Sequence, residues 1–263
     1  MTMTGLPTTE RRRLRLPDGR LVWCTRPAEA SLMWREISGD GFYRRASRGL
    51  RPGDAVLDIG ANVGLVSIAF AAENPGLRVI AAEPVPDTFD CLRANLDRYV
   101  PGGVAVRTAV AATAGTQRLT YYPDAPGNSG LYADRQADDA LTRTFMRNGG
   151  IDDESIDLLI EGLHDGHSLE VPVTTVSGLL REHGIARVAL LKVDVERAEL
   201  DVLRGVAPAD WSRIDAVVAE VHDEEQRLAE FCDLLRAAGL SPETRQDPSL
   251  SGTELYEVYG DRS

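Results

Sequence analysis

Cysteine, histidine and long apolar runs are all scarce in this chain of 263 residues. The three cysteines, Cys24, Cys91 and Cys232, show neither metal-ligand nor redox spacing, so we expect buried thiols in a reducing cytosol rather than a disulfide scaffold. No stretch approaches about 18 consecutive apolar residues, and the N-terminus lacks the apolar segment of a secretory signal. These absences predict a cytoplasmic protein without a transmembrane helix.

Basic residues are outnumbered, with 29 Lys and Arg against 41 Asp and Glu and a net charge of −12. A chain this acidic repels phosphate backbones and anionic lipid surfaces, so we expect neither nucleic acid nor a membrane as its partner. Apolar residues make up 43% of the chain, which is close to the globular average and enough for a substantial core. We expect a monomer or a homodimer.

Residues 1–50 are predicted to form a cap rather than a separate domain. The segments RRRLRL and RLVWC flank Pro17-Asp18-Gly19, which has the residue types of a turn, and residues 28–37 carry apolar side chains at helical spacing. One hairpin and one helix bury too little apolar surface to fold alone. We therefore expect this segment to pack on a main domain formed by residues 51–263.

Strand and helix patterns alternate after residue 51. Apolar runs of strand length occupy residues 55–60, 78–84, 104–112, 188–196 and 216–223. Helical patterns occupy residues 62–72, 86–99, 175–183, 198–204 and 224–238. This order predicts an α/β fold with a mostly parallel sheet and right-handed crossovers, and the alternating run at 254–260 predicts an antiparallel last strand.

Residues 113–170 interrupt this order. A weak alternation at 117–123 suggests an edge hairpin, and the remainder is polar with patchy helical periodicity. We expect a helical insertion that lies over the sheet. His164 and His167 fall within it and are expected to be exposed.

The turn after the first strand carries a candidate ligand site. Asp58 closes the strand, and Gly60, Asn62 and Gly64 follow in a G-x-x-x-G pattern. Open α/β sheets bind ligands at the carboxyl ends of their strands, and Gly and Asn allow a left-handed backbone close to a ligand. The pattern matches neither the dinucleotide fingerprint nor the phosphate-binding loop, which argues against a nicotinamide oxidoreductase.

Glu83 ends the second strand, where a carboxylate can accept both hydroxyls of a ribose. Together with Asp58 it suits a nucleoside that carries a cationic amino-acid arm, and S-adenosylmethionine is such a ligand. The alternative is that both acids only cap turns and helices.

The strands at 188–196 and 216–223 end in a second polar constellation. Residues 192, 194 and 196 are expected on one face of the first of these strands, which places Lys192, Asp194 and Glu196 together. Glu220 and His222 end the neighbouring strand. Buried charges need partners, so this cluster suits general-base catalysis, a metal site, or a structural ion-pair network around Lys192.

Four segments together resemble the FkbM family of S-adenosylmethionine-dependent methyltransferases. They are DIGANVG, the AAEP strand end, LLKVDVERAELDVLRG and VVAEVHD, and the segments MWREI and YYPDAPGNSGLY extend the resemblance over residues 14–260. The resemblance implies a class I Rossmann-like fold with seven strands and an antiparallel late strand. It also implies methyl transfer to a hydroxyl, and it is closest to the O-methyltransferases of macrolides and other polyketides.

The resemblance also implies roles for individual residues. Asp58, Gly60, Asn62 and Gly64 would surround the methionine arm and ribose of the cofactor, and Glu83 would hold the ribose hydroxyls. The adenine would lie near Thr108 and Ala109, and Asn128 and Ser129 would lie over the cofactor or the acceptor unless they form a plain surface turn. Tyr43 and Glu36 would close the pocket, with Glu220 at the acceptor. Arg197 stands where the family often has Gly.

We expect the acceptor hydroxyl to attack the methyl carbon in line with the sulfur, with much of the acceleration coming from alignment. His222 is the expected base, oriented by Glu196 or Asp194. The alternative mechanism places a divalent metal ion among Asp194, Glu220 and His222. A sugar methyltransferase or N-methyltransferase, or a non-catalytic binding module of the same fold, remains the alternative function.

Overall fold

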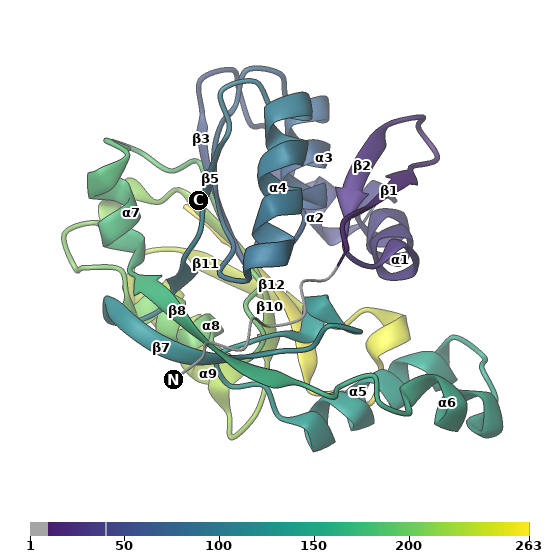
Figure 1. The fold of residues 1–263 in the computed structure, drawn as a ribbon. Coiled ribbons are helices and arrows are strands. Elements are labelled where there is room, and N and C mark those ends of the chain that lie inside the picture. Colours follow the sequence, from purple (N-terminus) through teal and green to yellow (C-terminus); the bar gives the residue numbers. More distant parts are fainter. Residues whose placement is uncertain (1–9, 40, 263) are drawn as a thin grey trace, which may run out of the picture.

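A seven-stranded sheet forms the centre of the computed structural model, which describes residues 10–39 and 41–262 (Figure 1). Its order is β11-β12-β10-β9-β3-β4-β5, and β12 runs antiparallel to both of its neighbours while the other pairs are parallel. The strands are β3 (Ala55–Ile59), β4 (Arg78–Ala82), β5 (Val104–Val106), β9 (Leu190–Val193), β10 (Ala216–His222), β11 (Ser241–Arg245) and β12 (Leu255–Asp261). The predicted fold class is confirmed, including the antiparallel last strand.

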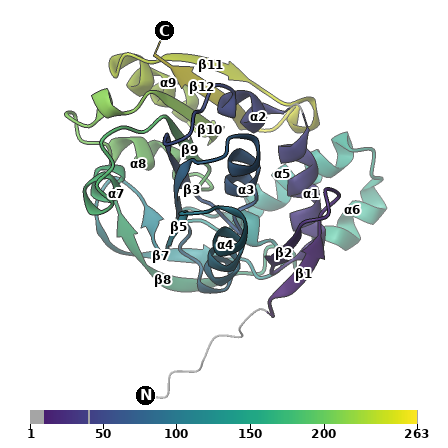
Figure 2. The same ribbon diagram turned by 90° about the horizontal axis from the view of Figure 1, so that it is seen from above.

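Helices cover both faces of this sheet (Figures 1 and 2). One face packs on α1 (Pro27–Ser38), α2 (Phe42–Ser47), α3 (Leu65–Glu73) and α4 (Pro86–Tyr99). The other packs on α7 (Val176–Glu182), α8 (Glu199–Arg204) and α9 (Arg227–Ala237). Successive strand residues point to opposite faces, so Val56 joins the first core while Leu57 and Ile59 join the second, all nearly inaccessible to solvent. The apolar runs in the sequence reflect this burial on both faces.

The N-terminal hairpin is tied to α4 by a buried asparagine. Strands β1 (Arg12–Arg15) and β2 (Leu21–Cys24) pair antiparallel, and β2 lies beside α4. Asn95 of α4 accepts a hydrogen bond from the backbone N–H of Trp23 and donates to the carbonyls of Trp23 and Val63. One side chain therefore joins the hairpin, the helix and the turn after β3.

Replacing Asn95 by Ala is expected to lower the free energy of unfolding by about 3 kcal/mol, because it leaves buried backbone groups without partners. Chemical denaturation would measure this. Asn74→Ala is the control, since the side chain of Asn74 donates to the carbonyl of Phe70 within its own helix end. Equal losses in the two variants would contradict the proposed role of Asn95 as a link.

A second, three-stranded sheet flanks the insertion. Its order is β6-β8-β7, formed by β6 (Ala109–Val110), β7 (Gly115–Tyr121) and β8 (His167–Thr174). The expected single strand at 104–112 is therefore wrong, because the chain leaves the central sheet after β5. Thr108 holds this bend with its hydroxyl, which lies within hydrogen-bond distance of the carbonyls of Ala109 and Pro172.

Two helices project from this second sheet, α5 (Arg135–Asn148) and α6 (Asp153–Ile160), as Figure 1 shows. The helical part of the predicted insertion is present, but strands frame it on both sides. His164 is buried rather than exposed, because its Nδ1 lies 2.7 Å from Asp139 Oδ1 and its ring packs on Tyr122. Short 3₁₀ turns lie at η1 (Pro126–Asn128), η2 (Trp211–Arg213) and η3 (Pro248–Leu250).

All three cysteines are free thiols in buried positions. Within residues 10–39 and 41–262, no helix combines the length and apolarity needed to span a membrane.

Candidate active site

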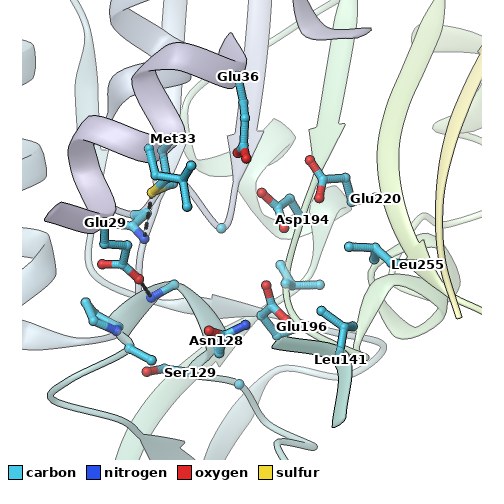
Figure 3. Close-up of a pocket in the computed structure, with 18 of the residues that line it drawn as sticks. Glu29, Met33, Glu36, Asn128, Ser129, Leu141, Asp194, Glu196, Glu220 and Leu255 are labelled. Atoms are coloured by element: carbon cyan, nitrogen blue, oxygen red, sulfur yellow. Dashed lines mark hydrogen bonds between the residues drawn. The ribbon is translucent and has the colours of Figure 1, made fainter. Parts of the chain in front are cut away.

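A cavity of about 1040 Å³ lies at the carboxyl ends of the central strands. Its walls come from α1, from the turns after β3, β4 and β9, from the connection that contains η1, and from α5 and α6. Many of the residues singled out in the sequence line it: Glu36, Tyr43, Gly60, Asn62, Glu83, Thr108, Ala109, Asn128, Ser129, Asp194, Glu196 and Glu220. Segments far apart in the chain thus meet at one site (Figure 3).

The turn after β3 adopts the left-handed backbone that its residue types allow. Gly60 has φ +73° and Asn62 has φ +47°. A Cβ atom on Gly60 would lie 1.6 Å from the carbonyl oxygen of Asp194, so only glycine fits between the two turns. The glycine lets β3 and β9 end side by side at the wall of the cavity.

Glu83 is buried at the end of β4 and holds this turn in place. Its carboxylate accepts hydrogen bonds from the backbone N–H groups of Asn62 (3.1 Å) and Val85 (2.9 Å). Burial outweighs these hydrogen bonds and raises the pKa of Glu83 to about 7. The carboxylate remains at the cavity surface, where it can accept further hydrogen bonds from a ligand.

Two predicted cofactor residues do not line the cavity. Asp58 is fully buried, accepts a hydrogen bond from Ser67 of α3 (2.6 Å) and pairs with Lys192 (3.2 Å). Gly64 begins α3 in a left-handed conformation, and a Cβ atom there would lie 2.8 Å from Leu92 of α4. The contacts of both residues are with α3, α4 and Lys192, and their assignment as cofactor residues stays a prediction.

Lys192 connects the two constellations predicted from the sequence. It lies beside Asp58 in the register of β9 and β3, and its Nζ donates to the carbonyl of Gly60 (2.6 Å). The same ammonium pairs with Asp194 at 3.3 Å. Burial alone would lower the pKa of Lys192, but Asp58 and Asp194 outweigh it and raise the pKa, so the lysine stays charged. The ammonium thus compensates two carboxylates at the base of the cavity.

Three carboxylates point into the cavity from the ends of β9 and β10: Asp194, Glu196 and Glu220 (Figure 3). Tyr43 of α2 donates a hydrogen bond to Glu220 (2.7 Å), and its hydroxyl also lies 3.4 Å from Asp194. Burial and the neighbouring charge of Asp194 raise the pKa of Glu220 above the ordinary carboxyl range. Burial and the same two acids raise the pKa of Tyr43 well above its usual value, so its phenol remains a donor.

Glu196 is backed by a buried histidine. His222 lies with Nε2 3.5 Å from Glu196 and Nδ1 3.3 Å from Glu199. Burial opposes the charged ring, but Glu199 and Glu196 outweigh it and raise the pKa of His222 to about 9. Burial also raises the pKa of Glu196, while the charge of His222 opposes that rise. The ring of His222 thus stands behind the carboxyl group of Glu196, which faces the cavity.

The sequence predicts that His222 faces the acceptor with Glu196 behind it. In the structure Glu196 lines the cavity and His222 lies behind it. His222 does not line the cavity, and both of its ring nitrogens face carboxylates. The expectation that Lys192, Asp194 and Glu196 share one strand face is also wrong for Glu196, because β9 ends at Val193 and Glu196 lies in a left-handed turn with φ +52°.

The ligand set of the metal alternative is not brought together, because His222 is turned toward Glu196 and Glu199 instead of Asp194 and Glu220. In the described part of the chain, no group of three or more His, Cys, Asp or Glu side chains is arranged to hold a metal ion.

Helix α1 contributes acids that the sequence analysis did not assign or left uncertain. Glu29, Met33 and Glu36 recur at i, i+4 and i+7 and all line the cavity. Glu29 accepts a hydrogen bond from the backbone N–H of Gly127 (2.8 Å), and burial raises its pKa to about 7. The helical spacing of these side chains was a readable signal, but acids on a short cap helix resemble a solvent-exposed face.

The opposite wall is apolar and comes from the insertion. Leu141, Phe145 and Met146 of α5 line it with Leu159 and Leu163 of the α6 region. The cavity therefore has acidic side chains on one side and apolar side chains on the other. Thr108 and Ala109 also line the cavity, as do Asn128 and Ser129.

A family model described as "Methyltransferase FkbM domain" matches residues 58–241. The chain belongs to the FkbM methyltransferase family. It is therefore a methyltransferase that depends on S-adenosylmethionine. The matched segment contains the turn after β3, Glu83 and the three carboxylates Asp194, Glu196 and Glu220.

Relatives that match this FkbM-family chain over nearly the whole length of both proteins include a bacterial and a fungal methyltransferase. The chain is 43% identical over 251 residues to the 31-O-demethyl-FK506 methyltransferase FkbM of Streptomyces tacrolimicus, which covers 95% of this chain and 96% of that protein. It is 31% identical over 257 residues to Methyltransferase 1 of Beauveria bassiana, covering 95% of this chain and 98% of that protein.

A solved structure of methyltransferase FkbM from Methylobacillus flagellatus resembles the fold with a TM-score of 0.50 at 12% sequence identity. The match covers 80% of this chain and 44% of that one.

Proposed function

We propose that this enzyme transfers a methyl group from S-adenosylmethionine to a hydroxyl group of a small, largely apolar natural product of the polyketide or macrolide type. One observation carries the proposal: a single cavity joins the cofactor turn, the carboxylates of the central strands and the apolar wall of α5. The relative whose name specifies 31-O-demethyl-FK506 supports an oxygen acceptor of this kind. Three buried free thiols suit an enzyme that works in the cytoplasm.

The residues of the turn fit S-adenosylmethionine. Gly60 and Asn62 line the cavity where the methionine arm and ribose would lie, and Glu83 offers an acceptor for the ribose hydroxyls beside its two backbone donors. Thr108 and Ala109 would lie at the adenine, and Ser129 and Asn128 between cofactor and acceptor. When bound, the cofactor supplies a methyl group on a sulfonium sulfur.

We propose Glu196 as the base that takes the proton of the acceptor hydroxyl as the oxygen attacks the methyl group. Asp194 pairs with Lys192 and Glu220 accepts from Tyr43, so these two acids are better suited to binding the acceptor than to removing its proton. His222 and Glu199 lie behind Glu196 and hold it in place. In this proposal the cap of residues 1–50 and the insertion of residues 113–170 shape the part of the cavity that binds the acceptor.

Calorimetric titration with S-adenosylmethionine, with NAD as the control ligand, tests the cofactor half. Only the sulfonium cofactor is expected to bind. Because the ribose hydroxyls prefer the ionised form of a carboxylate whose pKa is about 7, affinity should rise from about pH 6 through pH 7 and level off near about pH 8. Glu83→Gln should weaken binding by about tenfold or more and reduce this rise. Equal binding by the variant at all pH values would contradict the role of Glu83.

Methyl transfer is tested with a panel of acceptors, and the readout is the mass of the product. The panel contains apolar hydroxyl compounds, the amine analogue of each, and sugars. Preference for the apolar hydroxyl compound supports the proposal, and preference for an amine or sugar favours the alternative functions. The same assay with EDTA addresses the metal-dependent alternative, in which a divalent ion lowers the pKa of the hydroxyl. Turnover that survives the chelator favours Glu196 as the base.

A further inference from the structure

Arg197 follows Glu196 directly and is one of the most deeply buried charged residues of the protein. Its guanidinium does not line the cavity. It pairs instead with Asp138 of α5, with Glu224 after β10 (2.5 Å) and with Glu254 before β12 (3.8 Å). A buried charge is tolerated only with such partners, so this arginine joins three segments that are distant in the sequence.

The backbone at this point is held in a conformation that side chains disfavour. Glu196 and Arg197 are consecutive left-handed residues, with φ +52° and +71°. The N–H of Arg197 donates to Glu199 (2.8 Å), and its carbonyl accepts from Arg227 (2.8 Å). Gly130 packs against the other side, where a Cβ atom would lie 2.7 Å from the carbonyl of Glu196. Such strain persists only where the surroundings over-determine it, and it is commonly found at functional sites.

The ion pair with Asp138 connects Arg197 to α5, the helix that forms the apolar wall. Asp138 is 2% exposed, and its second carboxylate oxygen accepts a hydrogen bond from Tyr122 (2.9 Å). Leu141 and Phe145 follow at i+3 and i+7, so they share its face of α5 and line the cavity. The position of Asp138 therefore sets the position of the wall.

We propose that Arg197 is a positioning residue that couples the acceptor-facing wall of α5 to the turn that presents Glu196. The ion pair between Arg197 and Asp138 sets the distance from the apolar wall to the carboxylate. A bound acceptor is thereby delivered with its hydroxyl at Glu196. The inference rests on the proposed function, because it assigns this part of the cavity to the acceptor. It makes acceptor use, and not cofactor affinity, depend on Arg197.

Arg197→Gly is the main test, since glycine suits the left-handed backbone and removes the whole side chain with its guanidinium. Its KM for the acceptor is expected to rise about tenfold and its kcat to fall about tenfold, with the Kd for S-adenosylmethionine changed less than about twofold. Amide hydrogen exchange over residues 135–148, measured without acceptor, should accelerate about tenfold. Arg197→Lys keeps the positive charge but loses the planar guanidinium that pairs with several carboxylates at once. Its values should therefore lie between those of the wild type and of Arg197→Gly.

Arg147→Gln is the matched control, because it removes an exposed ion pair from α5 to Asp153 without touching Asp138. It should leave kinetics and exchange unchanged. Should Arg197→Gly fold poorly because Asp138 is left unpaired, the double variant Arg197→Gly/Asp138→Asn removes both charges. Its effects should be smaller than the product of those of the single variants.

Unchanged exchange in α5 together with an unchanged acceptor KM would overturn the coupling. The two proposals fail separately in this design. If the wild-type enzyme binds S-adenosylmethionine but methylates no hydroxyl compound, the proposed function fails, while the exchange measurement still decides whether Arg197 holds α5.

Discussion

Gly60→Ala is expected to abolish cofactor binding, with an affinity for S-adenosylmethionine at least about 100-fold weaker than that of the wild type. The added Cβ atom would lie 1.6 Å from the carbonyl oxygen of Asp194 and 2.7 Å from its carbonyl carbon. Both atoms belong to the backbone, so neither can swing away as a flexible side chain would. The turns after β3 and β9 must separate, which disturbs Asn62, Glu83 and the acids of the cavity together.

Calorimetry would measure the loss of affinity, and circular dichroism would show that the variant remains folded. Gly102→Ala is the matched control, because Gly102 has φ +77° and no heavy atom near the position of an added Cβ. That variant isolates the cost of a left-handed alanine, about 1 kcal/mol of folding stability, and should bind the cofactor normally. Similar loss of binding in both variants would show that strain, and not the close approach to Asp194, governs the site.

The elements that lie inside the central sheet were readable because burial on both faces leaves continuous apolar runs. The runs ending near Asp58, Glu83, Asp194 and Glu220 predicted which residues meet at the carboxyl edge of the sheet. The elements outside that sheet were harder to predict. Strand β8 buries only alternate residues and contains Pro172, which weakens the strand pattern. Strand β11 is a polar edge strand with no buried residue, and the pattern gave no sign of it.

The side-chain directions at the strand ends were the main failure of the sequence analysis. Asp58 lies one residue before the end of β3, so its side chain points beneath α3 instead of into the cavity. Beyond Val193 the alternation of a strand no longer applies. The left-handed backbone at Glu196 directs its side chain into the cavity, where His222 was expected. Periodicity predicts faces only while the strand continues.

The apolar wall and its link to Glu196 depend on contacts between residues that are distant in the sequence. Arg197 and Asp138 are 59 residues apart, and neither has a local pattern that marks it as buried. An arginine after an acid and an aspartate in a polar helix both resemble surface residues. Both are buried where their ion pair joins α5 to the turn after β9, a contact that only the folded chain shows.

Glu196→Gln is expected to lower kcat by about 100- to 1,000-fold, because the amide fills the same space but cannot take a proton from the acceptor hydroxyl. The Kd for S-adenosylmethionine should stay within about twofold, since the turn that holds Gly60, Asn62 and Glu83 is untouched. Burial raises the pKa of Glu196, so its ionised form accumulates only above the ordinary carboxyl range. Wild-type kcat should therefore rise with pH in that region, and this rise should be absent from the small residual activity of the variant.

Glu220→Gln and Glu36→Gln are the comparisons that make this assignment specific, because both acids face the same cavity. Glu220 accepts from Tyr43, so its amide variant should mainly raise the KM for the acceptor. Glu36 lies on α1, across the cavity from Glu196, and its variant should change kcat only slightly. A loss of kcat in Glu220→Gln greater than that in Glu196→Gln would move the base to β10. His222 would then be a support for the turn alone, since its contacts are with Glu196 and Glu199.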